Sequence, residues 1–252
     1  MGNAQPSAPS AAVLLYLFAD RVIEPDTAMS KAFEVPCTQV RVKQTFLAAD
    51  LFGISFWQLA EEGKIQLTIG KKTLLGMGKP QITATLQPGV SMPQPQTTQL
   101  DPTQLAAMGG VPANVGKMLQ QLGPQIAMAQ TTRATTFQEA IITRLASMQP
   151  TPVRDVIRDW FGSDVGDPQG YVVNHMGHEL SELGLLSGVT QGGIFATAKP
   201  IIDCAKRSAL EEAAGTLLTR WLAFRTDESG LGPTLRDRCK AAIGSRQEGD
   251  DE

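Results

Sequence analysis

The chain has 252 residues, 42% of them hydrophobic, and a formal net charge of −3. This length and composition can supply a sizeable core for one large domain or two small ones. The slightly negative charge gives no overall basic field, which argues against non-specific nucleic-acid binding. The three cysteines, Cys37, Cys204 and Cys239, lie far apart without a CxxC pair. We therefore expect buried or incidental thiols in a reducing cytosol, with neither a zinc ribbon nor a disulfide framework.

Apolar runs in the chain are short. No segment reaches the roughly 18 uninterrupted apolar residues that a transmembrane helix needs. The run AAVLLYLF at 11–18 lacks the basic residues that precede the core of a signal peptide. We expect a soluble cytoplasmic protein without a transmembrane segment.

A first folded unit is predicted over 11–86, after a disordered Pro/Ser/Ala-rich start at 1–10. Its opening apolar stretch, AAVLLYLFADRVI, predicts a short buried helix. From residue 40 to about 62, apolar residues recur at helical spacing but Gly53 interrupts them. This pattern predicts two packed helices.

A hairpin and then an insertion follow. The stretch IQLTIGKKTLLGM predicts a strand over 64–69 and a return strand through Leu74–Leu75. The segment 87–132 is rich in Pro and Gln, which predicts an irregular connection, with a weak helix over 115–129.

The second folded unit is predicted over 133–226. Thr135 or Thr136, followed by Glu139, matches a capping box and predicts a helix that ends near Met148.

Three further helices are predicted in this unit, followed by a polar tail at 227–252. One has Pro152 in its first turn and Gly162 just after its end. The next ends at Gly184 and leads into a second hairpin. The last is a long amphipathic helix over about 203–224.

The two units contain a weak repeat. LAEEGKIQLTIGKKTLLGMGKP at 59–80 and LSELGLLSGVTQGGIFATAKP at 180–200 share their order of leucine, glycine, apolar pair, turn and Lys-Pro. Gly63 and Gly184 are expected to end a helix in the left-handed conformation and start a strand. We therefore predict a mainly α fold with small β-hairpins, as two winged-helix-like units in one compact helical body. Coincidental helix–glycine–strand junctions are the alternative.

The charged residues at the expected recognition-helix positions indicate whether such units would bind DNA. The stretches FGISFWQLAEEG and YVVNHMGHELSELG, at the recognition-helix positions, contain no Arg or Lys, although DNA-reading helices bring such cations to phosphates. Lys71 and Lys72 in the first wing add only two cations. Nucleic acid is thus an unlikely ligand, and a tandem winged-helix module that binds protein through its wings is the alternative function.

The order of four motifs resembles the Golgi phosphoprotein 3 family. They are DLFGISFWQLAEEGKIQL, EAIITRLASMQPTPVRDVIRDWFG, HELSELGLL and FATAKPIIDCAKRSALEEAAGTLLTRW. Together they cover about 44–224, once the insertion is set aside. The resemblance implies a mainly helical peripheral membrane protein. Its eukaryotic members bind phosphatidylinositol 4-phosphate and link Golgi membranes to coat proteins and glycosyltransferases.

The family's lipid pocket uses a tryptophan and arginines, and this chain departs from that pattern. The corresponding positions fall at Phe52 and near Lys43, Gly170 and Val173. For this chain the resemblance therefore implies a non-enzymatic cytosolic adaptor without a cofactor, with an anionic phospholipid and a protein as expected partners.

The candidate headgroup residues are the cations that remain nearby, Arg41, Lys43 and His175. A few cations near an anionic surface give weak, salt-sensitive binding. His175 and His178 do not complete a metal-binding or zincin pattern, since the chain has no other histidine. No catalytic or metal site is predicted.

Overall fold

The structure is a computed structural model that describes residues 8–26, 31–70, 80–93, 136–147, 150–161, 165, 167–189, 200–228 and 230–244. The chain divides into one compact unit, Met1–Met92 with Thr136–Glu252, and a second unit, Pro93–Thr135. Beyond Pro93 the predicted insertion, with its helix at 115–129, lies outside the described residues. The described part of the first unit is mainly helical with small antiparallel strand pairs, as the sequence predicts.

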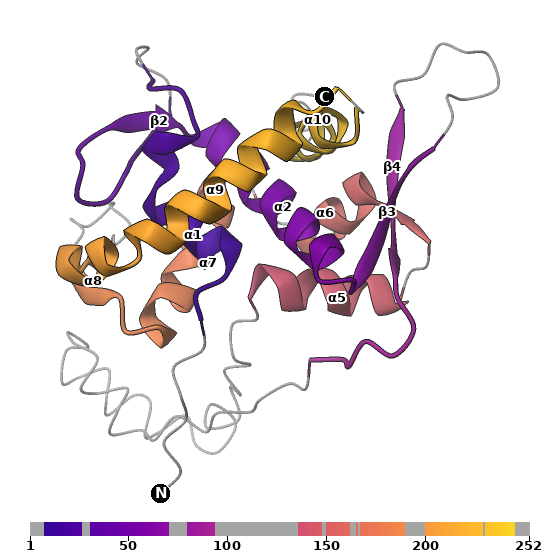
Figure 1. The fold of residues 1–252 in the computed structure, drawn as a ribbon, viewed down its shortest axis with the longest axis horizontal. Helices are drawn as coiled ribbons and strands as arrows, with labels where there is room; N and C mark the ends of the chain where they lie inside the picture. Colours follow the sequence, from indigo (N-terminus) through magenta and orange to yellow (C-terminus); the bar gives the residue numbers. More distant parts are fainter. Residues whose placement is uncertain are drawn as a thin grey trace, which may run out of the picture. The chain divides into compact units, whose positions relative to one another are not determined.

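Two apolar helices from the N-terminal part supply much of the core. Helix α1 (Ala11–Leu17) buries all seven of its residues, which confirms the short helix predicted there. Ser10 caps it, because its hydroxyl oxygen accepts a hydrogen bond from the Val13 N–H at 3.2 Å. The 3-10 helix η1 (Ala19–Arg21) follows, and helix α2 (Gln44–Glu61) lies at the centre of Figure 1.

Helix α2 is continuous across Gly53, so the prediction of two helices there is wrong. A Cβ atom at this position would lie 2.9 Å from the Cη2 atom of Trp221. The missing side chain therefore lets the fully buried Trp221 ring pack onto α2. Burying so large a ring outweighs the roughly 1 kcal/mol that glycine costs inside a helix.

The predicted glycine turns are present at the ends of two helices. Gly63, between α2 and strand β3 (Ile65–Gly70), has a φ of 67°. Gly184, between helix α7 (Pro168–Glu182) and strand β6 (Leu186–Val189), has a φ of 63°. Both are in the left-handed region that favours glycine, as expected for the residue just after a helix.

The same hydrogen bond closes both of these helix ends. The Lys64 N–H donates to the Leu59 carbonyl at 2.9 Å, and the Leu185 N–H donates to the Leu180 carbonyl at 2.9 Å. This is the six-residue closure of a Schellman motif. The leucine four residues before each glycine is buried in the core. The sequence repeat thus corresponds to a repeated local structure.

Short antiparallel strand pairs follow these turns and also precede α2. In the first hairpin β3 pairs with a strand that begins at Gln81, later than the predicted return through Leu74–Leu75, which lies outside the described residues. The pairs are β1 (Ala32–Glu34) with β2 (Arg41–Lys43), β3 with β4 (Gln81–Leu86), β4 with β5 (Thr151–Pro152), and β6 with β7 (Pro200–Ile202).

Helix α5 (Phe137–Ser147) begins at the predicted capping box. The Thr136 N–H donates to the Glu139 carboxylate at 3.0 Å, and the Glu139 N–H donates to the Thr136 hydroxyl oxygen at 3.2 Å. Helix α6 (Val153–Phe161) follows, with Pro152 immediately before it. Both predicted helices are confirmed.

The predicted long helix over 203–224 is two helices, α8 (Cys204–Ala209) and α9 (Glu211–Thr226), which meet at Leu210. Helix α8 buries none of its residues, whereas α9 buries three apolar ones. The two helices therefore face different surroundings.

A further helix, α10 (Leu231–Gly244), occupies most of what the sequence analysis assigned to a polar tail, so that assignment is wrong for these residues. Leu235, Cys239, Ala242 and Ile243 are fully buried, at the spacing of one helical face. Helix α10 packs against α2 and α6 and is the yellow helix near the C-terminal label in Figure 1.

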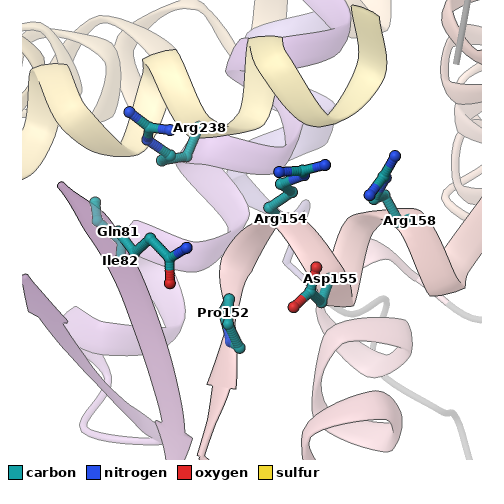
Figure 2. Close-up of a pocket in the computed structure, with 7 residues that line it drawn as sticks. All are labelled: Gln81, Ile82, Pro152, Arg154, Asp155, Arg158 and Arg238. Atoms are coloured by element: carbon teal, nitrogen blue, oxygen red, sulfur yellow. The ribbon is translucent and has the colours of Figure 1, made fainter. Parts of the chain in front are cut away.

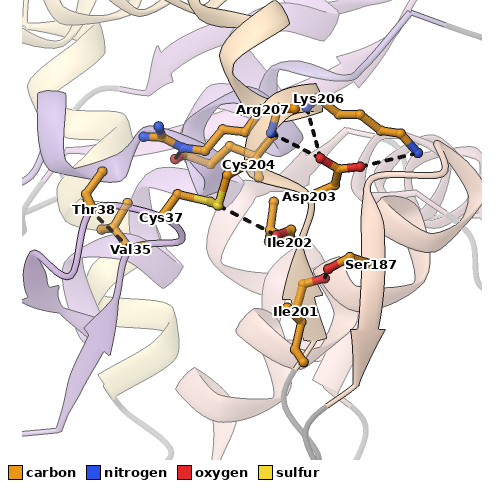
Figure 3. Close-up of a disulfide and its surroundings, with 12 residues drawn as sticks. Val35, Cys37, Thr38, Ser187, Ile201, Ile202, Asp203, Cys204, Lys206 and Arg207 are labelled. Carbon is orange, nitrogen blue, oxygen red and sulfur yellow. Dashed lines mark hydrogen bonds and ion pairs between the residues drawn. A yellow bond between two sulfur atoms is a disulfide. The ribbon is translucent and has the colours of Figure 1, made fainter.

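A disulfide joins Cys37 to Cys204, 167 residues apart in the sequence. It links the turn between β1 and β2 to the start of α8 (Figure 3). The prediction that the chain has no disulfide is therefore wrong, while Cys239 is the expected buried free thiol. Disulfides are rare in the cytosol, so the cysteines no longer support a cytosolic location.

Candidate functional site

Three cations surround one aromatic ring where α10 packs against the first turn of α2. The Lys43 Nζ, Arg236 Cζ and Lys240 Nζ atoms lie 5.4, 5.1 and 4.7 Å from the centre of the Phe46 ring. Cations within about 6 Å of a ring centre are attracted to its face. We call these four residues the Phe46 cluster.

Arg236 is held in this cluster by a buried carboxylate. Its Nε atom donates to the Asp50 carboxylate at 2.9 Å, and Arg225 donates to the other oxygen of that carboxylate at 2.8 Å. Asp50 is fully buried. Burial raises the pKa of the Asp50 carboxyl, and the charges of Arg236 and Arg225 oppose that rise. One carboxylate thus pairs with two arginines, so the three side chains together carry a net charge of about +1.

The two lysines come from positions that add to the same field. Lys240 lies one helical turn after Arg236, so both point to the same face of α10. Lys43 directly precedes α2, whose first turn contains no acidic residue. The N-terminus of a helix carries a partial positive charge. The start of α2 and the cations of the cluster therefore favour an anion at the same place.

Of the predicted headgroup residues, Arg41 and Lys43 lie on one face of β2. Val42 between them is fully buried, so its neighbours point away from the core. The strand register places Glu34 opposite Arg41, and a carboxylate there offsets part of the Arg41 charge. Lys43 is consequently the stronger of the two as an anion ligand.

His175, the third predicted residue, lies in a different environment. Its ring is edge-on to Phe137 at 5.0 Å and to Trp160 at 5.1 Å between ring centres. These contacts make it part of an aromatic cluster. It is not part of the Phe46 cluster.

Two positions that the resemblance assigns to the family's lipid pocket, Phe52 and Gly170, make close contacts in this chain. Phe52 is buried, and its ring packs edge-on against three others, those of Phe137, Trp160 and Phe161. At Gly170 an added Cβ atom would lie 2.5 Å from the Asp167 carboxylate, which caps α7. An arginine at that position would therefore displace the cap.

Sequence reasoning missed Arg236 and Lys240, because 227–252 was assigned to a tail. The helical spacing of Leu231, Leu235 and Cys239 was the available signal. The wing residues Lys71 and Lys72 lie outside the described residues.

Among the described residues, no group of three His, Cys, Asp or Glu side chains is placed to hold a metal ion, and no helix is long and apolar enough to cross a membrane. No family model, curated protein or solved structure matches the chain. The resemblance to the Golgi phosphoprotein 3 family therefore rests on the four sequence motifs alone.

Proposed function

We propose that this protein is a non-enzymatic adaptor that binds anionic phospholipid surfaces peripherally, with phosphatidylinositol 4-phosphate as the preferred lipid. The observation that carries the proposal is the Phe46 cluster, in which residues about 190 positions apart bring three cations around one partly exposed ring. The family resemblance supports the choice of lipid.

The composition of the cluster suits a membrane surface. Each cation near an anionic bilayer contributes about 1 kcal/mol, so Lys43 and Lys240 together contribute about 2 kcal/mol, roughly 30-fold in binding, and Arg236, whose charge is shared with Asp50, adds less. Arg236 is held by Asp50 and gives a fixed contact, whereas Lys43 and Lys240 have flexible stems that adapt to headgroups. A phosphomonoester such as that of phosphatidylinositol 4-phosphate concentrates more negative charge than a phosphodiester and is favoured for that reason.

The proposal does not require a cytosolic leaflet. The Cys37–Cys204 disulfide is typical of oxidising compartments, and anionic phospholipids present the same phosphate chemistry on either side of a membrane. The alternative function is a tandem winged-helix module, in which the two helix–hairpin repeats bind a protein partner through their wings.

Co-sedimentation with vesicles tests the lipid part. We expect binding to phosphatidylcholine vesicles that contain phosphatidylinositol 4-phosphate, weaker binding to vesicles with phosphatidylserine at equal surface charge, and none to phosphatidylcholine alone. Raised salt should weaken the binding, because the cations are near the surface and are screened. Equal binding to neutral and anionic vesicles, or binding to neither, would contradict the proposal.

A further inference from the structure

A cavity of about 250 Å³ lies between β4, the start of α6 and α10. Figure 2 shows Arg238 projecting from α10, Arg154 and Arg158 from α6, and Gln81 from β4. The lining residues are Gln81, Ile82, Pro152, Arg154, Asp155, Arg158 and Arg238. None of the residues of the Phe46 cluster lines this cavity.

Positive charge dominates this cavity. Three of the lining residues are arginines and one, Asp155, is a carboxylate. Arg154 and Arg158 are four residues apart on α6, so they lie on neighbouring turns of one helix face. Arg238 comes from a different helix, and its neighbours Leu235 and Cys239 are fully buried. The three guanidiniums are thus gathered by the fold and not by sequence proximity.

Arg238 also carries a donor without a partner. Its Nε atom is buried, and no hydrogen-bond acceptor reaches it among the described residues. Buried donors nearly always have a hydrogen-bond acceptor, because a donor that loses its hydrogen bonds to water and gains no other carries a free-energy cost. An anion bound by the Arg238 guanidinium group would offset this missing interaction.

The start of α6 adds to the attraction. Arg154 and Asp155 lie in the first turn of α6, which is nine residues long. The free N–H groups of a first helical turn and the helix dipole favour a negative group there.

We propose that this cavity binds a phosphate monoester, with Arg154, Arg158 and Arg238 as its ligands. Each guanidinium group can donate two parallel hydrogen bonds to phosphate oxygens. A phosphate group has enough oxygens to engage three arginines, whereas a bound carboxylate has only two. Asp155 and the Gln81 amide accept hydrogen bonds from hydroxyl groups on the remainder of the molecule. The volume is just below the roughly 300–1,000 Å³ of sites for drug-sized ligands, so a small ligand is expected.

The phosphate monoester has two sources, a soluble metabolite or a lipid headgroup. Calorimetric titration of the full chain with inorganic phosphate and with glycerol 3-phosphate tests the first source. Co-sedimentation with vesicles containing phosphatidic acid tests the second. In a ¹⁵N-labelled sample, the Nε–Hε resonance of Arg238 reports whether the anion binds at that guanidinium group.

Three variants make the assignment specific. Arg154→Gln, at an exposed position that leaves the core intact, should weaken binding by about tenfold or more, because a charge-assisted hydrogen bond is lost. Asp155→Asn should tighten binding of inorganic phosphate, which has no ester group for Asp155 to contact, because a repelling charge is removed. The double variant Lys43→Gln/Lys240→Gln should bind the soluble ligands unchanged, which keeps this site separate from the proposed membrane surface.

Saturable binding that follows this pattern, and shifts the Arg238 resonance, supports the proposal. If only phosphatidic acid vesicles bind, and Arg154→Gln abolishes that binding, the site holds a lipid headgroup. Absence of binding to all three probes overturns the proposal. Binding that is lost in Lys43→Gln/Lys240→Gln but kept in Arg154→Gln also overturns it, since the anion would then sit at the Phe46 cluster.

Discussion

The Asp50 carboxylate, in the middle of α2, accepts a hydrogen bond from the Arg236 Nε atom on α10 at 2.9 Å. Arg225 on α9 donates to the same carboxylate at 2.8 Å. One buried side chain therefore ties the last two helices of the described chain to the central one. The same contact positions Arg236 beside Phe46, so the core and the candidate site share a residue.

Replacing Asp50 should be among the more damaging single changes. Asp50→Asn keeps the shape of the side chain but leaves two arginines, partly buried, without their anion. Breaking a buried ion pair by removing one partner typically costs about 3–5 kcal/mol. Urea unfolding of the variant should show a loss of this size. A loss below about 1 kcal/mol, the value of a surface pair, would contradict the assigned role.

The contact between Gly53 and Trp221 gives a matched pair of glycine substitutions. Gly53→Ala should destabilise the protein by about 1–3 kcal/mol, because the added methyl group overpacks against the Trp221 ring. Gly177→Ala, inside α7, meets no atom within 4 Å and should stabilise by about 0.5–1 kcal/mol through helix propensity. Thermal unfolding of both variants checks the prediction. Equal effects at the two positions would contradict the packing of Trp221.

The disulfide can be counted directly. Of the three cysteines, only Cys239 is free. Unreduced protein in denaturant should therefore show one reactive thiol per chain, and reduced protein three. Because the Cys37–Cys204 bond closes a loop of more than a hundred residues, its reduction should cost about 2–5 kcal/mol of stability. Three thiols before reduction would contradict the disulfide.

Glu179 should make stability depend on pH. Its carboxylate is buried and accepts hydrogen bonds from the Ser10 hydroxyl at 3.0 Å and the Phe137 N–H at 2.9 Å. Burial raises the pKa of Glu179 above the usual 4.5, and these hydrogen bonds oppose the rise. Between 4.5 and the higher pKa of the folded state, the folded protein binds more protons than the unfolded chain.

Stability must consequently fall as pH rises through that window, by about 1.4 kcal/mol for each unit by which the pKa is raised. Glu179→Gln does not titrate and lacks this contribution. The difference in free energy of unfolding between the wild type and Glu179→Gln should therefore favour the wild type most below pH 4.5 and decline as pH rises above that value. A difference that is constant with pH, or that grows, would show that burial does not dominate.

Local rules predicted several features of the fold correctly. The glycine turns at Gly63 and Gly184 and the capping box of Thr136 and Glu139 each depend on residues within one helical turn. Such motifs are specified by backbone conformation and nearby hydrogen bonds. They are readable before any tertiary contact is known.

Two of the features that the sequence did not reveal depend on distant residues. Gly53 resembled a helix break because nothing nearby shows that Trp221 packs on it. The disulfide joins cysteines 167 residues apart, so spacing gave no sign of it. Helix α10 was instead assigned to a polar tail because Gly230, Gly232 and Pro233 stand at its start, although its apolar residues recur at helical spacing. The Phe46 cluster and the arginine-lined cavity both include residues of α10, and those residues were missed together with the helix.

We propose above that the Phe46 cluster binds anionic membranes. Removing its two lysines in Lys43→Gln/Lys240→Gln should weaken binding to phosphatidylinositol 4-phosphate vesicles by about 30-fold, from about 1 kcal/mol per cation. Lys43 makes no side-chain cap hydrogen bond to α2, so its loss should not unfold that helix. The control Lys64→Gln/Arg144→Gln removes the same charge from exposed surface ion pairs elsewhere.

Vesicle co-sedimentation of wild type, cluster variant and control, at one lipid composition and salt concentration, is the most direct measurement. We expect that the cluster variant alone loses binding, while the control stays within about twofold of the wild type, as expected for weakly coupled surface charges. Equal loss in both double variants would mean that net charge drives binding, and unchanged binding in the cluster variant would remove the Phe46 cluster as the membrane site.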